Sequence, residues 1–166
     1  MRCGVHRRAF LTGQVTPELP AMTPPGSGGD FLRLCDGCGA CADACSAGII
    51  VKGKVPTVDF DRGACTFCGE CIAACPTDAL EPERLSDWPW RGVIIDNCLS
   101  LNGIACRACE DACDLRAIRF RLMTGGRSAP VLDQSQCTGC GECAFTCPAE
   151  AIRFKLVEAS ERETLQ

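Results

Sequence analysis

One spacing of cysteines recurs three times in this chain of 166 residues. The spacing is Cys-x2-Cys-x2-Cys-x3-Cys, and its copies occupy residues 35–45, 65–75 and 137–147. The chain has 17 cysteines, and free thiols at that density are an oxidation hazard. So many cysteines in a short chain indicate either disulfide bonds or bound metal.

The repeated run matches a bacterial signature for iron–sulfur ligation that ends in Cys-Pro. Three thiolates spaced by two residues on one tight loop can bind three corners of a cubane, while the helix that starts there carries the fourth cysteine away. In two-cluster proteins that fourth cysteine binds the other cluster. Pro76 and Pro148 complete the signature in two motifs, whereas Ser46 and Asp114 occupy the matching places in the other two.

Two other uses of cysteine fit the pattern less well. Structural zinc sites typically use two Cys-x2-Cys pairs separated by a long gap, so the third cysteine of each loop would have no role. An odd number of cysteines argues against a closed disulfide framework. Iron–sulfur binding is the interpretation that uses every cysteine of each motif.

A fourth group of cysteines, in "DNCLSLNGIACRACEDAC" at 96–113, departs from the regular spacing. Cys106, Cys109 and Cys113 keep the end of the pattern, but seven residues separate Cys98 from Cys106 where two are regular. The insert contains the turn-forming pair Asn102-Gly103, and a loop this much longer costs on the order of 1 kcal/mol or less to close. We interpret Cys98 as the displaced first ligand of a fourth motif. The alternative is a buried structural cysteine beside a three-cysteine site.

Internal similarity extends beyond the cysteines. "CGEC" occurs at 68–71 and 140–143, and "AIRF" occurs at 117–120 and 151–154, which indicates a duplicated two-motif unit. The segments 48–60 and 117–132 predict β-hairpins that turn at Gly53 and at Gly125-Gly126. Short helices are expected to follow the third cysteine of each motif, as in the Ala-rich stretches 71–75 and 143–147.

This organisation resembles the two-cluster bacterial ferredoxin fold, an α+β unit with pseudo-twofold symmetry. The resemblance implies tandem units at 31–80 and 93–157, joined by a linker at 81–92 and followed by a carboxy-terminal tail at 158–166. The proline- and glycine-rich residues 1–30 are predicted to form a flexible amino-terminal tail. Cross-ligation within each unit then predicts four [4Fe–4S] clusters and uses sixteen cysteines, leaving Cys3 over. The predicted ligand sets are Cys35, Cys38, Cys41 and Cys75 (cluster 1); Cys65, Cys68, Cys71 and Cys45 (cluster 2); Cys98, Cys106, Cys109 and Cys147 (cluster 3); and Cys137, Cys140, Cys143 and Cys113 (cluster 4).

Units of about 60 residues are marginal on hydrophobic burial alone, so cluster coordination is expected to supply much of the folding free energy. We expect the cluster-free protein to be largely unfolded. Trp88 and Trp90 are interpreted as packed between the units, the alternative being contact with a partner protein. The predicted core comprises Ile49, Val51, Val58, Phe60 and Ile72 in the first unit, and Ile118, Phe120, Leu132, Ile152 and Phe154 in the second.

Several function classes are excluded or disfavoured. A formal charge of −4 is unlike that of a nucleic-acid binder. The sequence contains no run of 18 apolar residues that could span a bilayer. No phosphate-binding loop, dinucleotide fingerprint or catalytic triad signature is present, so we predict a protein that is not an enzyme. Arg7-Arg8 resembles a twin-arginine export signal, but the apolar run that follows is only Ala9-Phe10-Leu11, so we predict a cytoplasmic protein.

The start "RRAFLTG", the segment "PPGSGGDFL", the regular motifs and the stretched third motif together resemble the NapF family of ferredoxin-type proteins. That resemblance implies a cytoplasmic accessory of the periplasmic nitrate reductase system. Its partner would be the molybdoenzyme catalytic subunit before export, which it would help to mature by electron or iron–sulfur delivery. The alternative is a general multi-cluster electron-transfer protein for a cytoplasmic oxidoreductase or quinol pathway.

Overall fold

Short helices mark the four cysteine motifs in the computed structural model, which describes residues 21–157. These helices are α3 (Ala40–Asp43), α4 (Glu70–Ala73), α5 (Ala108–Asp111) and α6 (Glu142–Phe145). Each begins one residue before the third cysteine of its motif, whereas we expected it to follow that cysteine. The third cysteine therefore lies in the first helical turn, where it is buried in all four motifs.

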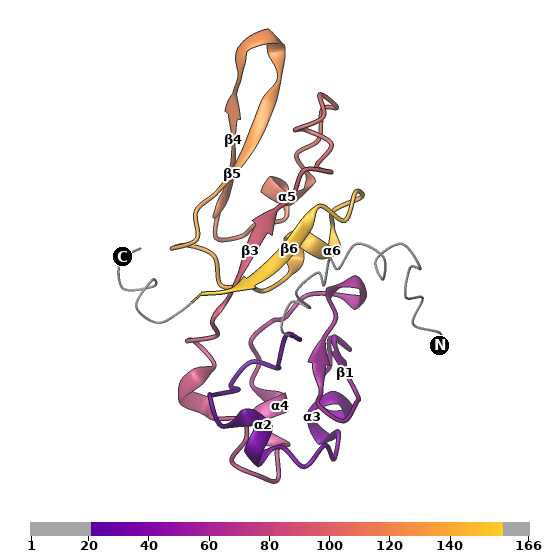
Figure 1. Cartoon of the computed structure of the whole chain (residues 1–166), viewed down its shortest axis with the longest axis vertical. Coiled ribbons are helices and arrows are strands. Elements are labelled where there is room, and N and C mark those ends of the chain that lie inside the picture. The colour runs from indigo at the N-terminus through magenta and orange to yellow at the C-terminus, as the bar shows by residue number, and fades with distance from the viewer. Residues whose placement is uncertain (1–20, 158–166) are drawn as a thin grey trace, which may run out of the picture.

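We call the part of the molecule with the motifs at 35–45 and 65–75 the first half, and the part with the motifs at 98–113 and 137–147 the second half. A β-hairpin joins the two motifs within each half, as the sequence predicts. In the first half, β1 (Ile50–Val51) pairs antiparallel with β2 (Thr57–Val58). In the second half, β4 (Ile118–Leu122) pairs antiparallel with β5 (Ser128–Leu132) over five residue pairs. The longer hairpin projects from one end of the molecule, and the first half forms the other end (Figure 1). The chain is thus an α+β protein, and the pseudo-twofold symmetry of its halves stays a prediction.

A third antiparallel sheet joins the two ends of the second half. It consists of β3 (Trp90–Ile94) and β6 (Ile152–Leu156), with Gly92 opposite Phe154. The strand β3 begins inside the segment that we predicted to be a linker, 81–92. The strand forms there because pairing with β6 satisfies its backbone hydrogen-bonding groups, while the side chain of Trp90 is buried in the core.

The remaining elements are short. They are the helix α2 (Phe31–Leu34) and the 3-10 turns η1 (Phe60–Arg62), η2 (Pro82–Arg84) and η3 (Thr124–Gly126), the last of which closes the β4–β5 hairpin. None of the helices in residues 21–157 has the length and apolar character needed to cross a membrane.

Residues 21–30 correct the expectation of a flexible tail that extends to Asp30. Pro24 and Pro25 are fully buried, and Ser27 forms an antiparallel bridge with Leu80. The Glu81 N–H donates to the carbonyl of Gly26 at 2.9 Å. Buried prolines leave no unpaired backbone donor, so this segment can lie against the core without a hydrogen-bonding penalty. The expectations for residues 1–20 and 158–166, including those for Arg7-Arg8 and Cys3, lie outside the described residues.

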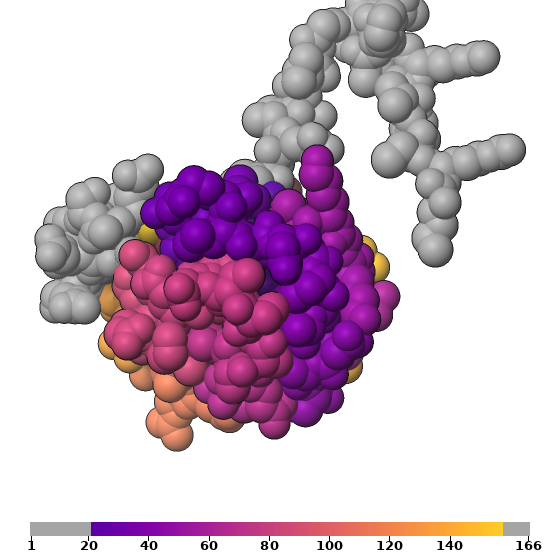
Figure 2. Space-filling view, turned by 90° about the horizontal axis from the view of Figure 1, so that it is seen from below, coloured from indigo at the N-terminus to yellow at the C-terminus, as the bar shows by residue number. Residues whose placement is uncertain are grey.

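Two groups of buried residues form the core, and most of the predicted core lies in them. The larger one includes Phe31, Ile49, Phe60 and Ile72, and Val58 packs against it half-buried. The smaller one is built on Ile118 and Ile152, with Phe120, Leu132 and Phe154 packed against it half-buried. Val51 is also half-buried. The first half therefore holds most of the core. In Figure 2 the first half and the segment that follows it make up most of the visible face.

The two tryptophans lie in the junction between the halves, which confirms the packing interpretation. Trp88 is 1% exposed and Trp90 is 3% exposed. The ring of Trp88 meets Phe60 and Phe67 edge-on, with centroid distances of 6.2 and 6.0 Å, and its indole N–H donates to the Thr23 carbonyl at 3.2 Å. Phe60 in turn lies 4.8 Å from the ring of Phe154 on β6. This aromatic contact fixes one half against the other.

Candidate metal centres

The sixteen described cysteines are all free thiols, and they line four separate cavities. Each cavity receives three cysteines from one motif and the fourth cysteine of the other motif in the same half. We number the cavities by the predicted clusters that they match. Site 1 is lined by Cys35, Cys38, Cys41 and Cys75; site 2 by Cys45, Cys65, Cys68 and Cys71; site 3 by Cys98, Cys106, Cys109 and Cys147; and site 4 by Cys113, Cys137, Cys140 and Cys143. Cys65 of site 2 also reaches the cavity of site 4, where the two sites adjoin.

The spacing of the thiols suits a multinuclear cluster better than a single ion. Within residues 21–157, no three His, Cys, Asp or Glu side chains lie close enough together to hold one metal ion. A tetrahedral zinc site would need its sulfurs about 2.3 Å from a common centre. A four-iron cubane instead binds one thiolate at each of its corners, so its ligands stand further apart. The donor set, four thiols around an otherwise apolar cavity, is the one that such clusters use.

Left-handed glycines turn the chain from each regular loop into its helix. Gly39, Gly69 and Gly141 precede α3, α4 and α6 with φ of 78°, 79° and 90°. A β-carbon disfavours that conformation, which explains the glycine at this point of each regular motif. In the stretched motif Arg107 takes the same place before α5 with φ of −136°. The longer loop reaches the helix by a different route and needs no glycine there.

The stretched loop places Cys98 with the other three cysteines of site 3. Cys98 is 8% exposed, and the loop after it closes through Ile104 N–H, which donates to the Leu99 carbonyl at 2.9 Å. The turn falls at Asn102-Gly103 as expected, and the Asn102 side chain donates to the Cys98 carbonyl at 2.9 Å. Ser100 is buried, and its hydroxyl donates to the Ser128 carbonyl on β5 at 2.6 Å. The insert is therefore an ordered part of the fold that covers site 3.

Burial raises the pKa of the third cysteine in every motif. The pKa rises to about 11 for Cys71 and Cys109 and to about 12 for Cys143, and it is also raised for Cys41. Desolvation of the thiolate is the main cause, and repulsion from neighbouring thiolates adds to it. Without iron these thiols stay protonated at neutral pH, so metal binding must release protons from the sites.

One feature of the sites was missed at the sequence level, namely the residue four places after each fourth cysteine. In the second half the N–H groups of Ala117 and Ala151 each donate to the sulfur of the preceding Cys113 or Cys147 at 3.3 Å. Such donors favour the thiolate and tune a bound cluster. The signal is present in the sequence: positions four after the fourth cysteines are all apolar, and all are at most 2% exposed (Ile49, Ala79, Ala117 and Ala151).

The four sites follow one another in the order 1, 2, 4, 3. Helix α3 packs against α4 in the first half and α5 packs against α6 in the second, so sites 1 and 2 are neighbours, as are sites 3 and 4. Across the junction the Cys65 N–H donates to the Cys140 carbonyl at 2.7 Å, which joins site 2 to site 4. Repulsion between thiolates joins the same neighbouring sites. Cys41 raises the pKa of Cys71, Cys140 raises that of Cys65, and Cys109 raises that of Cys143.

Comparison with known proteins agrees with this geometry. Residues 34–79 and 104–151 match the family described as 4Fe-4S dicluster domain. The chain is 36% identical to ferredoxin-type protein NapF of Escherichia coli K12, over 87% of this chain and 90% of that protein. The chain belongs to the NapF family of ferredoxin-type proteins. Its two dicluster segments and sixteen motif cysteines provide for four [4Fe–4S] clusters.

Other relatives place the family membership in context. NapF of Haemophilus influenzae is 36% identical over 82% of this chain and 86% of its own length. The methylamine utilization ferredoxin-type protein MauM of Methylorubrum extorquens is 30% identical over 84% of this chain and 74% of its own length. The second dicluster match begins after Cys98, so the stretched part of the third motif lies outside it.

Proposed function

We propose that the four cysteines of each site are the ligands of one [4Fe–4S] cluster, with the sets predicted from the sequence. The support is that each cavity gathers all four members of one predicted set. The cavities of sites 1, 2 and 3 contain no cysteine from another set, while the cavity of site 4 is also lined by Cys65 of the neighbouring site 2. In this proposal Cys98 is a ligand of site 3, because it lines that cavity together with Cys106, Cys109 and Cys147.

The function that this arrangement supports best is electron transfer, and the observation that carries it is the unbroken order of the sites. A bound [4Fe–4S] cluster gains or loses one electron while its thiolate ligands stay in place. The protein packs sites 2 and 4 against each other in the middle of this series and leaves sites 1 and 3 at the two ends of the series. A redox partner therefore has two terminal sites to approach, one in each half.

We further propose that the chain is an accessory that binds the catalytic subunit of periplasmic nitrate reductase before export. In this role it helps that subunit to mature by delivering electrons or iron–sulfur components, and it acts in the cytoplasm. The support is the family resemblance, together with a multi-site arrangement suited to supplying electrons. A general electron carrier for a cytoplasmic oxidoreductase or quinol pathway is the second candidate, favoured by the same order of sites.

A pull-down with anaerobically purified holoprotein separates the two candidates. The baits are the signal-bearing form of the catalytic subunit and its mature form. We expect stable capture of the signal-bearing form and much weaker capture of the mature form. Capture of neither bait, combined with rapid reversible oxidation by a general redox partner, would contradict the accessory role and leave the carrier.

A further inference from the structure

The two sheets of the second half present cationic side chains on the face turned away from the sites. On β4 the inward residues Ile118 and Phe120 line sites 4 and 3, and on β6 the inward residues Phe154 and Ile152 do the same. Since side chains alternate along a strand, the residues between them point outward. These outward residues are Arg119 and Arg121 on β4, and Arg153 and Lys155 on β6, and all four are exposed.

The partner strands add small apolar residues and no acid to this face. Directly paired residues lie on the same face of an antiparallel sheet. Arg119 is paired with Val131, Arg121 with Ala129, and Arg153 with Val93. Lys155 is paired with Arg91, whose guanidinium turns back to the carbonyls of Trp88 and Trp90. We call the surface made by Arg119, Arg121, Arg153 and Lys155 the outer strand face.

The cations of this face differ from those of the first half in their partners. Each of four cations that precede β3 in the chain has a carboxylate within 4.0 Å, namely Arg33, Lys52, Arg62 and Arg84. Between residues 21 and 157, none of the four cations of the outer strand face forms such an ion pair. Asp133 interacts with Arg119 at longer range, and Arg153 donates to the carbonyls of Glu150 and Ile152.

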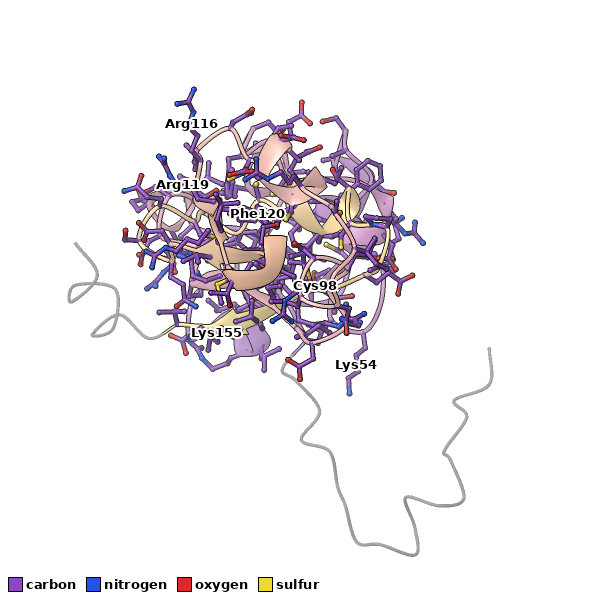
Figure 3. All side chains as sticks on the ribbon, turned by 90° about the horizontal axis from the view of Figure 1, so that it is seen from above. Lys54, Cys98, Arg116, Arg119, Phe120 and Lys155 are labelled. Carbon is purple, nitrogen blue, oxygen red and sulfur yellow. The ribbon has the colours of Figure 1, made fainter. Side chains whose placement is uncertain are left out.

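The molecule as a whole has the opposite sign from this face. The formal charge is −4, and clusters bound by four thiolates add further negative charge. The excess of acid lies elsewhere, so the cations on β4 and β6 form a local positive surface on an acidic protein. Figure 3 shows Arg119 and Lys155 toward the left of the molecule, whereas Lys54 of the first half lies toward the lower right.

We propose that the outer strand face is a docking surface for an acidic patch on a partner protein. Three of its four cations are arginines, whose planar fork pairs with carboxylates in two parallel hydrogen bonds. The small apolar Val131 and Val93 lie among these cations, and such a mixture of arginine and apolar contact is typical of protein interfaces. A phosphate polymer longer than the face would run over the acidic remainder of the chain and be repelled there, whereas an acidic patch of the size of the face would not. This docking surface is independent of the proposed nitrate reductase role.

A binding assay with the holoprotein and a fluorescent ten-residue polyglutamate peptide tests the proposal at low salt. The face variant carries R119Q, R121Q, R153Q and K155Q. The control variant carries R33Q, K52Q, R62Q and R84Q, which change the formal charge by the same amount. We expect the face variant to bind the peptide on the order of tenfold more weakly and the control on the order of twofold, with unchanged iron content in both. Equal weakening in the two variants would overturn the proposal.

Cross-linking locates the contact independently of affinity. A carbodiimide joins a lysine amine directly to a carboxylate, so we expect mass spectrometry to find the peptide attached at Lys155. The variant K155R should keep the affinity for the peptide but lose this cross-link. Attachment only at Lys52 or Lys54 would place the contact on the first half and overturn the proposal.

Three further binding measurements test other possible occupants of the outer strand face. Tighter binding to phosphatidylserine vesicles than to the peptide would indicate a membrane, and tighter binding to duplex DNA of equal charge would indicate nucleic acid. Residues 158–166 carry Glu158, Glu161 and Glu163. If their deletion raises the affinity for the peptide about tenfold, the tail of the same chain occupies the face. Each of these three results would overturn the proposal of an acidic partner protein.

Discussion

The first half pairs two residues across β1 and β2, whereas the second half pairs five across β4 and β5. The same contrast holds where the two ends of each half meet, since a single bridge joins Ser27 to Leu80 but β3 and β6 pair over five residues. The first half compensates with a larger core. Both halves nevertheless gather their cysteines by the same cross-motif scheme. The scheme therefore tolerates different scaffolds, because each site needs only the motif loop, its short helix and one cysteine from the other motif.

Removing iron from both halves should have the largest effect on the fold. Half-domains of this size bury too little apolar surface to fold alone, so cluster binding supplies much of the folding free energy. We expect chelation to abolish protease resistance and most of the far-ultraviolet circular dichroism. If the second half, with its longer ladders, stayed protected while the first unfolded, hydrogen bonding rather than coordination would hold that half.

Replacing Cys98 with serine tests the stretched motif against a regular one. We expect Cys98→Ser to lose up to one quarter of the bound iron, because one of the four predicted clusters loses a ligand. Cys35→Ser, which removes the first ligand of site 1, should lose a similar amount, and Cys3→Ser none. Iron counted per protein, together with visible absorption, measures the outcome. Undiminished iron in Cys98→Ser would show that site 3 closes without that residue.

Truncating Trp88 should weaken the junction, because Trp88 supports the ring of Phe60 that contacts Phe154 of the second half, and should leave each site in place. The side chain is 1% exposed and meets both Phe60 and Phe67. Trp88→Ala should destabilise the holoprotein by about 3–5 kcal/mol, as for other large buried aromatic residues. The shift in denaturant concentration at which the visible absorption bleaches measures this loss. Leu122→Ala is the control, since Leu122 is 86% exposed on the projecting hairpin and should change little.

Alanine substitutions at two left-handed glycines should give the smallest loss of stability. They compare a glycine at the junction between the halves with one in the stretched loop. At Gly141 the new carbon would run into the ring of Phe60 in the other half, while at Gly103 it would meet nothing within 4 Å. Gly141→Ala should cost about 2–4 kcal/mol, from backbone strain and overpacking together. Gly103→Ala should cost about 1–2 kcal/mol, from the strain alone. Equal costs, measured by the same bleaching curves, would mean that the halves can move apart at no cost.

Much of the site could be predicted from local spacing, but its surroundings could not. The hairpins at 48–60 and 117–132 follow from glycine turns between alternating residues. The start of β3 at Trp90 and the packing of Pro24 and Pro25 depend on strands and helices distant in the chain, which no local pattern reports. The backbone donors at Ala117 and Ala151 were missed because the apolar residue four places after each fourth cysteine indicates burial but does not report a backbone hydrogen bond to sulfur.

The cysteine spacing by itself determined the cofactor class and the number of sites, and it predicted which cysteines share a cluster. Coordination chemistry accounts for this, since a loop with three thiolates at fixed spacing admits few ligands other than a cubane. Only the tertiary structure decided that sites 2 and 4 are neighbours and that sites 1 and 3 lie at the two ends of the series of sites. That order depends on how Trp88, Phe60 and Phe154 pack between the halves. Such packing joins residues far apart in the chain, and its geometry exists only once both halves are folded.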